Sequence, residues 1–62
     1  MLLVPDPAMR RALVFSRYCD VVAIFHYRDG HWSFELQRGL QHSDLAVEEI
    51  HLLETYQSEL NT

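Results

Sequence analysis

The stretch Tyr27-Arg28-Asp29-Gly30-His31-Trp32 decides the fold of this 62-residue chain, because alternating hydrophobic segments lie on both sides of its Asp-Gly pair. An Asp-Gly pair in this setting is typical of a two-residue β-hairpin loop. We expect strands over about 21–28 and 31–37, with Tyr27 opposite Trp32 and Phe25 opposite Phe34. One face of the hairpin then carries a ladder of aromatic side chains, which a flanking helix can cover, and the other face is wet.

A helix is predicted before the hairpin, over about residues 7–19. Asp6 is suited to the N-cap and Pro7 to the first helical position, where its missing N–H is not needed. Helical spacing places Arg10 and Arg17 together on one side. The short run 13–15, Leu-Val-Phe, is also compatible with a strand. The expected apolar face of this helix consists of Ala8, Met9, Ala12, Leu13, Phe15 and Cys19.

A second helix is predicted over about residues 44–60, with Ser43 as N-cap and acidic residues near its positive end. Glu49 points into the middle of its apolar arc and divides the arc into two seams. Either Glu49 pairs with an arginine, in this chain or in a partner, or it lies at the wet edge of the arc. We expect one seam to cover the hairpin and the other to meet a second surface. One seam holds Leu45, Leu52 and Tyr56, and the other holds Ala46, Ile50, Leu53 and Leu60.

The expected fold is a single α+β domain over residues 1–62 with the order α-β-β-α, in which an antiparallel β-hairpin packs against the helices. A hydrophobic content of 48% is enough for a packed core. A chain this short buries only about 60% of its unfolded surface, and Cys19 has no second cysteine to pair with. We therefore expect added stability from self-association, most commonly as a homodimer, or from a partner protein.

The charge of the chain is unevenly distributed. All five arginines lie within residues 1–38, whereas residues 39–62 hold five acidic residues and no basic one apart from histidine. An acidic C-terminal third argues against nucleic acid as a general partner, because neutralising phosphates needs Lys and Arg. It suits a protein partner with a basic surface.

Other features of the sequence indicate a cytoplasmic protein. The longest apolar run, residues 21–25, is far too short to span a membrane. The N-terminal segment lacks the basic start and apolar stretch of a signal peptide. A single unpaired cysteine, Cys19, fits a reducing compartment.

No residue pattern indicates a metal, a cofactor or catalysis. The spacings among Cys19 and the four histidines match no known ligand pair, although His26 and His31 share the wet face of the hairpin. Cys19 is expected to be a buried apolar side chain rather than a nucleophile. Glu48 and Glu49 are adjacent and diverge on a helix, so they do not form an acid–base pair.

We therefore expect a small non-enzymatic regulator, inhibitor or adaptor, of the kind that phage and accessory genes encode. It would bind a protein partner through its acidic second helix. The alternative is a small dimeric nucleic-acid-associated regulator whose first helix places Arg10 and Arg17 on phosphates. The predicted partner-binding residues are Glu48, Glu49, Leu52, Glu54, Tyr56 and Glu59.

Replacing Gly30 by valine tests the predicted loop. A type I′ turn needs a positive φ at this position, so Gly30→Val should lower the free energy of unfolding by about 1 kcal/mol or more. Gly30→Asn is the matched control, because asparagine tolerates this conformation. Urea unfolding of both variants checks the prediction, and equal stability would contradict it.

Overall fold

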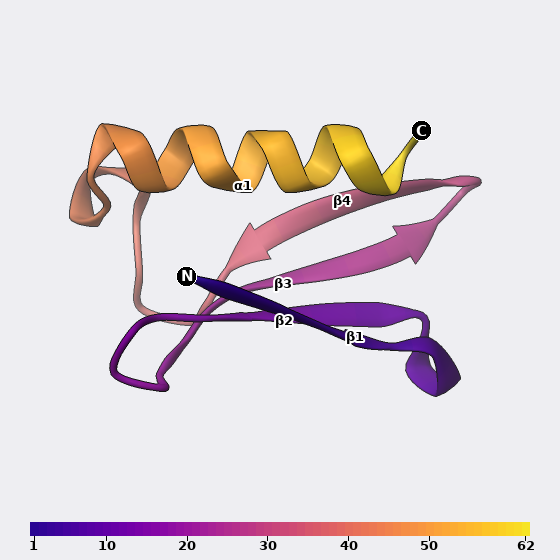
Figure 1. The fold of residues 1–62 in the computed structure, drawn as a ribbon, viewed down its shortest axis with the longest axis horizontal. Coiled ribbons are helices and arrows are strands. Elements are labelled where there is room, and N and C mark those ends of the chain that lie inside the picture. The colour runs from indigo at the N-terminus through magenta and orange to yellow at the C-terminus, as the bar shows by residue number, and fades with distance from the viewer.

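The computed structural model describes all 62 residues and consists of one sheet and one helix (Figure 1). The strands β1 (Leu2–Asp6), β2 (Arg11–Phe15), β3 (Val21–Arg28) and β4 (His31–Leu36) form an antiparallel sheet in the order β1-β2-β3-β4. The helix α1 (Val47–Leu60) lies along one face of this sheet. Two single turns of 3-10 helix, η1 (Pro7–Met9) and η2 (His42–Asp44), lie in the connections.

The structure confirms the predicted hairpin and its register. Phe25 is opposite Phe34 with ring centroids 5.2 Å apart, and Tyr27 is opposite Trp32 with ring centroids 5.6 Å apart. The loop residue Asp29 has φ 53° and its neighbour Gly30 has φ 84°. Both central residues therefore have the positive φ of a type I′ turn, whose twist matches that of the flanking strands.

The predicted order α-β-β-α is wrong, because residues 7–19 do not form a helix. The order is β-β-β-β-α: η1 ends where Arg10 takes a left-handed conformation with φ 51°, and β2 begins at the next residue. Alternate residues of β2 point to opposite faces of the sheet, so Ala12 and Val14 are buried beneath α1. Pairing with strands on both sides prevails over the helical spacing that the same residues happen to show.

The second helix is confirmed but begins at Val47 rather than near residue 44. Asp44 ends η2, where its carboxylate accepts a hydrogen bond from the Gln41 N–H at 2.8 Å. Leu45 and Ala46 are extended, which turns the chain toward the start of α1. No helix in the structure has both the length and the apolar character needed to span a lipid bilayer.

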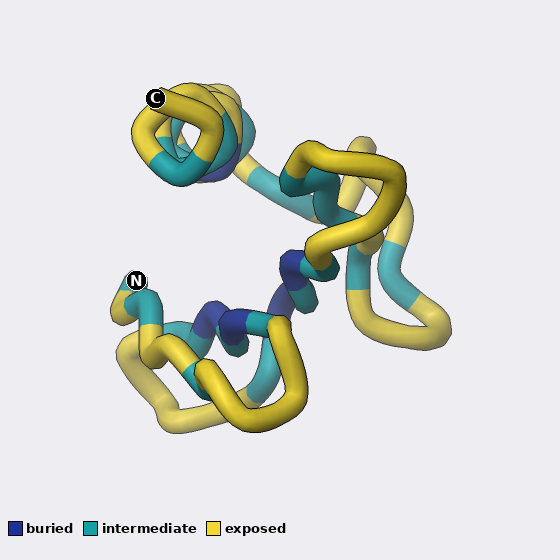
Figure 2. The backbone as a smooth tube through the Cα atoms, turned by 90° about the vertical axis from the view of Figure 1, so that its right-hand side faces the viewer, coloured by how far each residue is buried: buried dark blue, intermediate teal, exposed yellow.

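The core lies between α1 and the middle of the sheet. In Figure 2 the buried positions gather in the central strands and on the side of the helix that faces them. Leu53 is the one fully buried residue of α1. The core cluster is Ala12, Val14, Ala23, Phe25 and Leu53, with Met1, Leu3, Trp32, Phe34, Leu36, Leu45, Tyr56 and Leu60 packed around it.

The end of α1 is tied to the outer edge of β4 by one side-chain amide. Asn61 Oδ1 accepts the Trp32 backbone N–H at 2.6 Å, and Asn61 Nδ2 donates to the Trp32 carbonyl at 2.9 Å. Gln57 Nε2 also donates to this carbonyl, at 3.4 Å. The Asn61 amide thus takes the place of a neighbouring strand and protects the exposed edge.

Asn61→Asp and Asn61→Ala test this contact. Both should lower the free energy of unfolding by about 1 kcal/mol, because each removes at least one hydrogen bond, and the aspartate also turns an oxygen toward the Trp32 carbonyl. Ser58→Ala, an exposed change one turn earlier, should have little effect and is the control. If Asn61→Ala is as stable as the parent, the amide does not hold the helix on the sheet.

Candidate functional site

The predicted partner-binding residues lie on α1 but not on one common surface. Glu48, Glu54 and Glu59 are exposed, and they flank the outward side of the helix together with Val47, which is 67% exposed. We call these four residues the acidic surface. Leu52 and Tyr56 are half-buried, and Tyr56 packs against the core.

Glu49 is explained by the start of the helix rather than by an ion pair. Its carboxylate accepts the Ala46 N–H at 2.9 Å, and its own N–H donates to the Ala46 carbonyl at 3.0 Å. This reciprocal contact satisfies backbone groups that the first turn of a helix leaves free. The Arg11–Asp6 ion pair and the His26–Glu35 contact do not include Glu49. Glu49 is therefore half-buried beside the apolar arc because its carboxylate caps the start of α1.

The two predicted seams of α1 do not serve two surfaces. Leu45 and Tyr56 from one seam and Leu53 and Leu60 from the other all pack against the same core. The other seam residues do not belong to this core: Leu52 lines a cleft beside the helix, Ile50 is half-buried and Ala46 is exposed. The helix thus has one buried side and a different outward side, which is the acidic surface.

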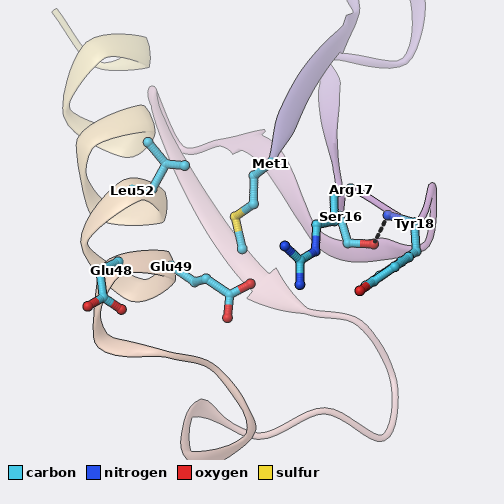
Figure 3. Close-up of a pocket in the computed structure, with 7 residues that line it drawn as sticks. All are labelled: Met1, Ser16, Arg17, Tyr18, Glu48, Glu49 and Leu52. Carbon is cyan, nitrogen blue, oxygen red and sulfur yellow. Dashed lines mark hydrogen bonds between the residues drawn. The ribbon is translucent and has the colours of Figure 1, made fainter.

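A cleft of about 460 Å³ lies between the start of α1 and the turn that joins β2 to β3 (Figure 3). The side chains of Arg17 and Glu49 point toward one another across it. The Arg17 guanidinium lies 5.1 Å from the centroid of the Tyr18 ring, and the Ser16 hydroxyl accepts the Tyr18 N–H at 3.1 Å, which shapes the turn. The lining residues are Met1, Ser16, Arg17, Tyr18, Glu48, Glu49 and Leu52.

The cleft brings three predicted residues, Glu48, Glu49 and Leu52, together with Arg17. Sequence reasoning missed Arg17 here because it placed that residue on a helix. The charges of the cleft are of both signs and lie at an open surface, so the arrangement offers electrostatic contacts to a polar chain segment. It shows no hydrogen-bonded pair of a nucleophile and a base.

The structure also leaves one face of the sheet without any covering element (Figure 2). This face is opposite to the one that packs on α1, and its apolar residues come from β1, β2 and β3. We call it the open sheet face. It carries Leu2, Val4, Leu13, Phe15 and Ile24, as the strand register and the alternation of side chains indicate.

The sequence predictions for Cys19 and the arginines need correction. Cys19 is exposed in the turn between β2 and β3, with φ 65°, and is not buried on a helix. Arg10 and Arg17 lie at opposite ends of β2, so no arginine-bearing helix is present. His, Cys, Asp and Glu side chains do not gather in a group of three or more suited to a metal ion.

Comparison with known proteins adds nothing to these surfaces: no protein-family model, no curated protein and no solved structure matches the chain.

Glu49→Ala and Glu49→Gln separate the capping role of this residue from a role of its charge. Loss of the cap in Glu49→Ala should lower the free energy of unfolding by about 0.3–1.5 kcal/mol. Glu49→Gln should keep most of the stability, because its amide oxygen still accepts the Ala46 N–H. Thermal unfolding followed by circular dichroism measures both. If the two variants lose stability equally, the negative charge and not the cap is responsible.

Proposed function

We propose that this chain is a small non-enzymatic regulator, inhibitor or adaptor that binds a protein with a basic surface. The observation that supports the proposal is the acidic surface of α1. Glu48, Glu54 and Glu59 are exposed there along the helix that Val47 begins, and residues 39–62 contain no lysine or arginine. Because α1 packs on the sheet with its other side, the acidic surface is free to meet a partner.

The chemistry of this surface suits association rather than catalysis. Exposed carboxylates of one sign raise the local concentration of a basic partner and speed its approach. The exposed side chain of Val47 adds apolar area at the start of the helix, next to Glu48, and charged residues at the rim of an interface act mainly on the association rate. An acidic helix of this kind supports a protein partner better than a nucleic acid, whose phosphates it would repel.

We further propose a cytoplasmic location and self-association into a homo-oligomer. An exposed unpaired thiol, that of Cys19, is compatible with a reducing compartment. Only six of the 62 residues are buried, which is a small core for an independent chain. A second copy would add burial that the single chain lacks.

Charge reversal on α1 tests the proposed binding surface. The partner is first isolated from the native host by affinity capture and identified by mass spectrometry. The variant with Glu48→Lys, Glu54→Lys and Glu59→Lys should then bind it about tenfold more slowly or worse at low salt, because the electrostatic steering is reversed. Stopped-flow or surface-based kinetics measure this association rate, while circular dichroism should show an unchanged fold.

A matched pair of single reversals serves as the control. Glu54→Lys and Asp20→Lys change the net charge equally, but Asp20 lies in the turn between β2 and β3 and not on α1. Only Glu54→Lys should slow association markedly. Equal effects would mean that overall charge and not this surface matters, and salt-dependent binding of a DNA or RNA duplex would favour the nucleic-acid alternative.

A further inference from the structure

The central strands are built as if both faces of the sheet were covered. In an antiparallel sheet with one wet face, polar residues alternate with apolar ones, as they do in β4, where Ser33 and Glu35 point away from α1. β2 and β3 break this rule: residues 12–15 and residues 21–25 are apolar without interruption. Uninterrupted apolar strands are typical of sheets that lie between two layers, but α1 supplies only one.

The register shows that the uncovered apolar side chains form a contiguous block. One row across the sheet joins Leu2 to Phe15, and the next joins Val4, Leu13 and Ile24. Leu2 is 62% exposed and Val4 is 39% exposed. Leu13, Phe15 and Ile24 are half-buried, because each lies in a strand with paired strands on both sides. The block is thus widest open at β1, the edge strand.

A polar row bounds this block at the end next to η1. Asp6 pairs there with Arg11 at 3.2 Å, and His26 is the next residue of the row. Glu35 lies opposite Ile24, in the row of Val4 and Leu13, and its carboxylate is 3.3 Å from His26. Charges of both signs are therefore present within this row. The open sheet face consequently differs from the acidic surface of α1, which carries one sign only.

We propose that a second copy of this chain covers the open sheet face, sheet against sheet. The inference rests on the self-association proposed above, to which it assigns a surface, and it is independent of the acidic surface of α1. The charge distribution favours this occupant. Two copies of a chain with net charge −4 repel through their acidic helices, but the opposite charges of Asp6 and Arg11 at the border of the open sheet face let the two sheet faces approach.

The size of the surface is in keeping with such a dimer. A standard interface buries about 800 Å² on each partner, which is about a sixth of the 4596 Å² that this chain exposes. One side of a two-layer molecule can supply this area. The contact is isologous, because the same face is used twice, and it gives a closed dimer of the layers α/β/β/α with the two sheets about 10 Å apart.

The proposed arrangement leaves α1 of each copy on the outside. Each dimer then presents two acidic surfaces on opposite sides, and none of Glu48, Glu54 or Glu59 is covered. Self-association and partner binding therefore use different residues, which allows the two to be tested separately.

Sedimentation of the purified chain and of two variants tests the proposal. The parent should sediment at twice its 7.3 kDa chain mass, and its melting temperature should rise with concentration. The variant Leu2→Glu with Val4→Glu should sediment at 7.3 kDa, because it buries two carboxylates in the interface. The matched control Val47→Glu makes the same kind of change at an exposed position of α1 and should stay dimeric.

A second measurement uses the unaltered chain, so that the test does not depend on whether the double variant folds. In a mixture of isotope-labelled and unlabelled chain, filtered nuclear Overhauser spectra should show contacts between the methyl groups of Leu2, Val4, Leu13 and Ile24 of one copy and the same face of the other. A parent that sediments at 7.3 kDa at every concentration overturns both the dimer and the proposed self-association. A dimer that Val47→Glu dissolves, or whose intermolecular contacts come from α1, overturns the sheet-face contact alone. Neither outcome bears on the acidic surface, which the kinetics of the lysine variants test.

Discussion

The packing of Leu53 against the centre of the sheet is the contact on which the fold depends. It is the one fully buried residue of α1, and it meets a sheet whose central strands carry small residues, Ala12 and Ala23, on that face. These small side chains leave room for the helix to approach. Full burial of a leucine side chain stabilises a fold by about 1.5–3 kcal/mol, a large share for a chain with only six buried residues. The Asn61 contact then fixes the direction in which α1 runs along β4.

What could be predicted from the sequence was local. The hairpin is specified by two adjacent residues, Asp29 and Gly30, and by the alternation on both sides of them, so its register followed without knowledge of the rest. The strands β1 and β2 are specified by pairing with each other and with β3. That pairing depends on residues distant in sequence, and the spacing of apolar residues in 8–19 was equally compatible with a helix. The run 13–15 contained the correct signal, since β-branched and aromatic residues fit a pleated sheet.

The candidate site was likewise predictable only where it depends on residues that are close in sequence. Glu49 stood out in the sequence as a charge within an apolar arc, but its partner could not be named, because the expected helix began about three residues too early. Once Val47 is the first helical residue, Glu49 is the third and lies within reach of the Ala46 N–H. The open sheet face was missed because Ile24 is expected, from the sequence, on the wet side of an isolated hairpin. Leu13 comes to lie opposite Ile24 only when β2 is a strand.

The two edges of the sheet bear on how copies of this chain can associate. An exposed strand edge invites another strand and, through it, open-ended growth. Here the edge strand β1 contains Pro5, which has no N–H to offer, and the outer edge of β4 is occupied at Trp32 by the Asn61 amide. Addition of strands is thus disfavoured at both edges, while the acidic surface of α1 resists contact between helices. The remaining way for two copies to associate is to stack their open sheet faces. Because this contact pairs a surface with itself, it gives a closed dimer.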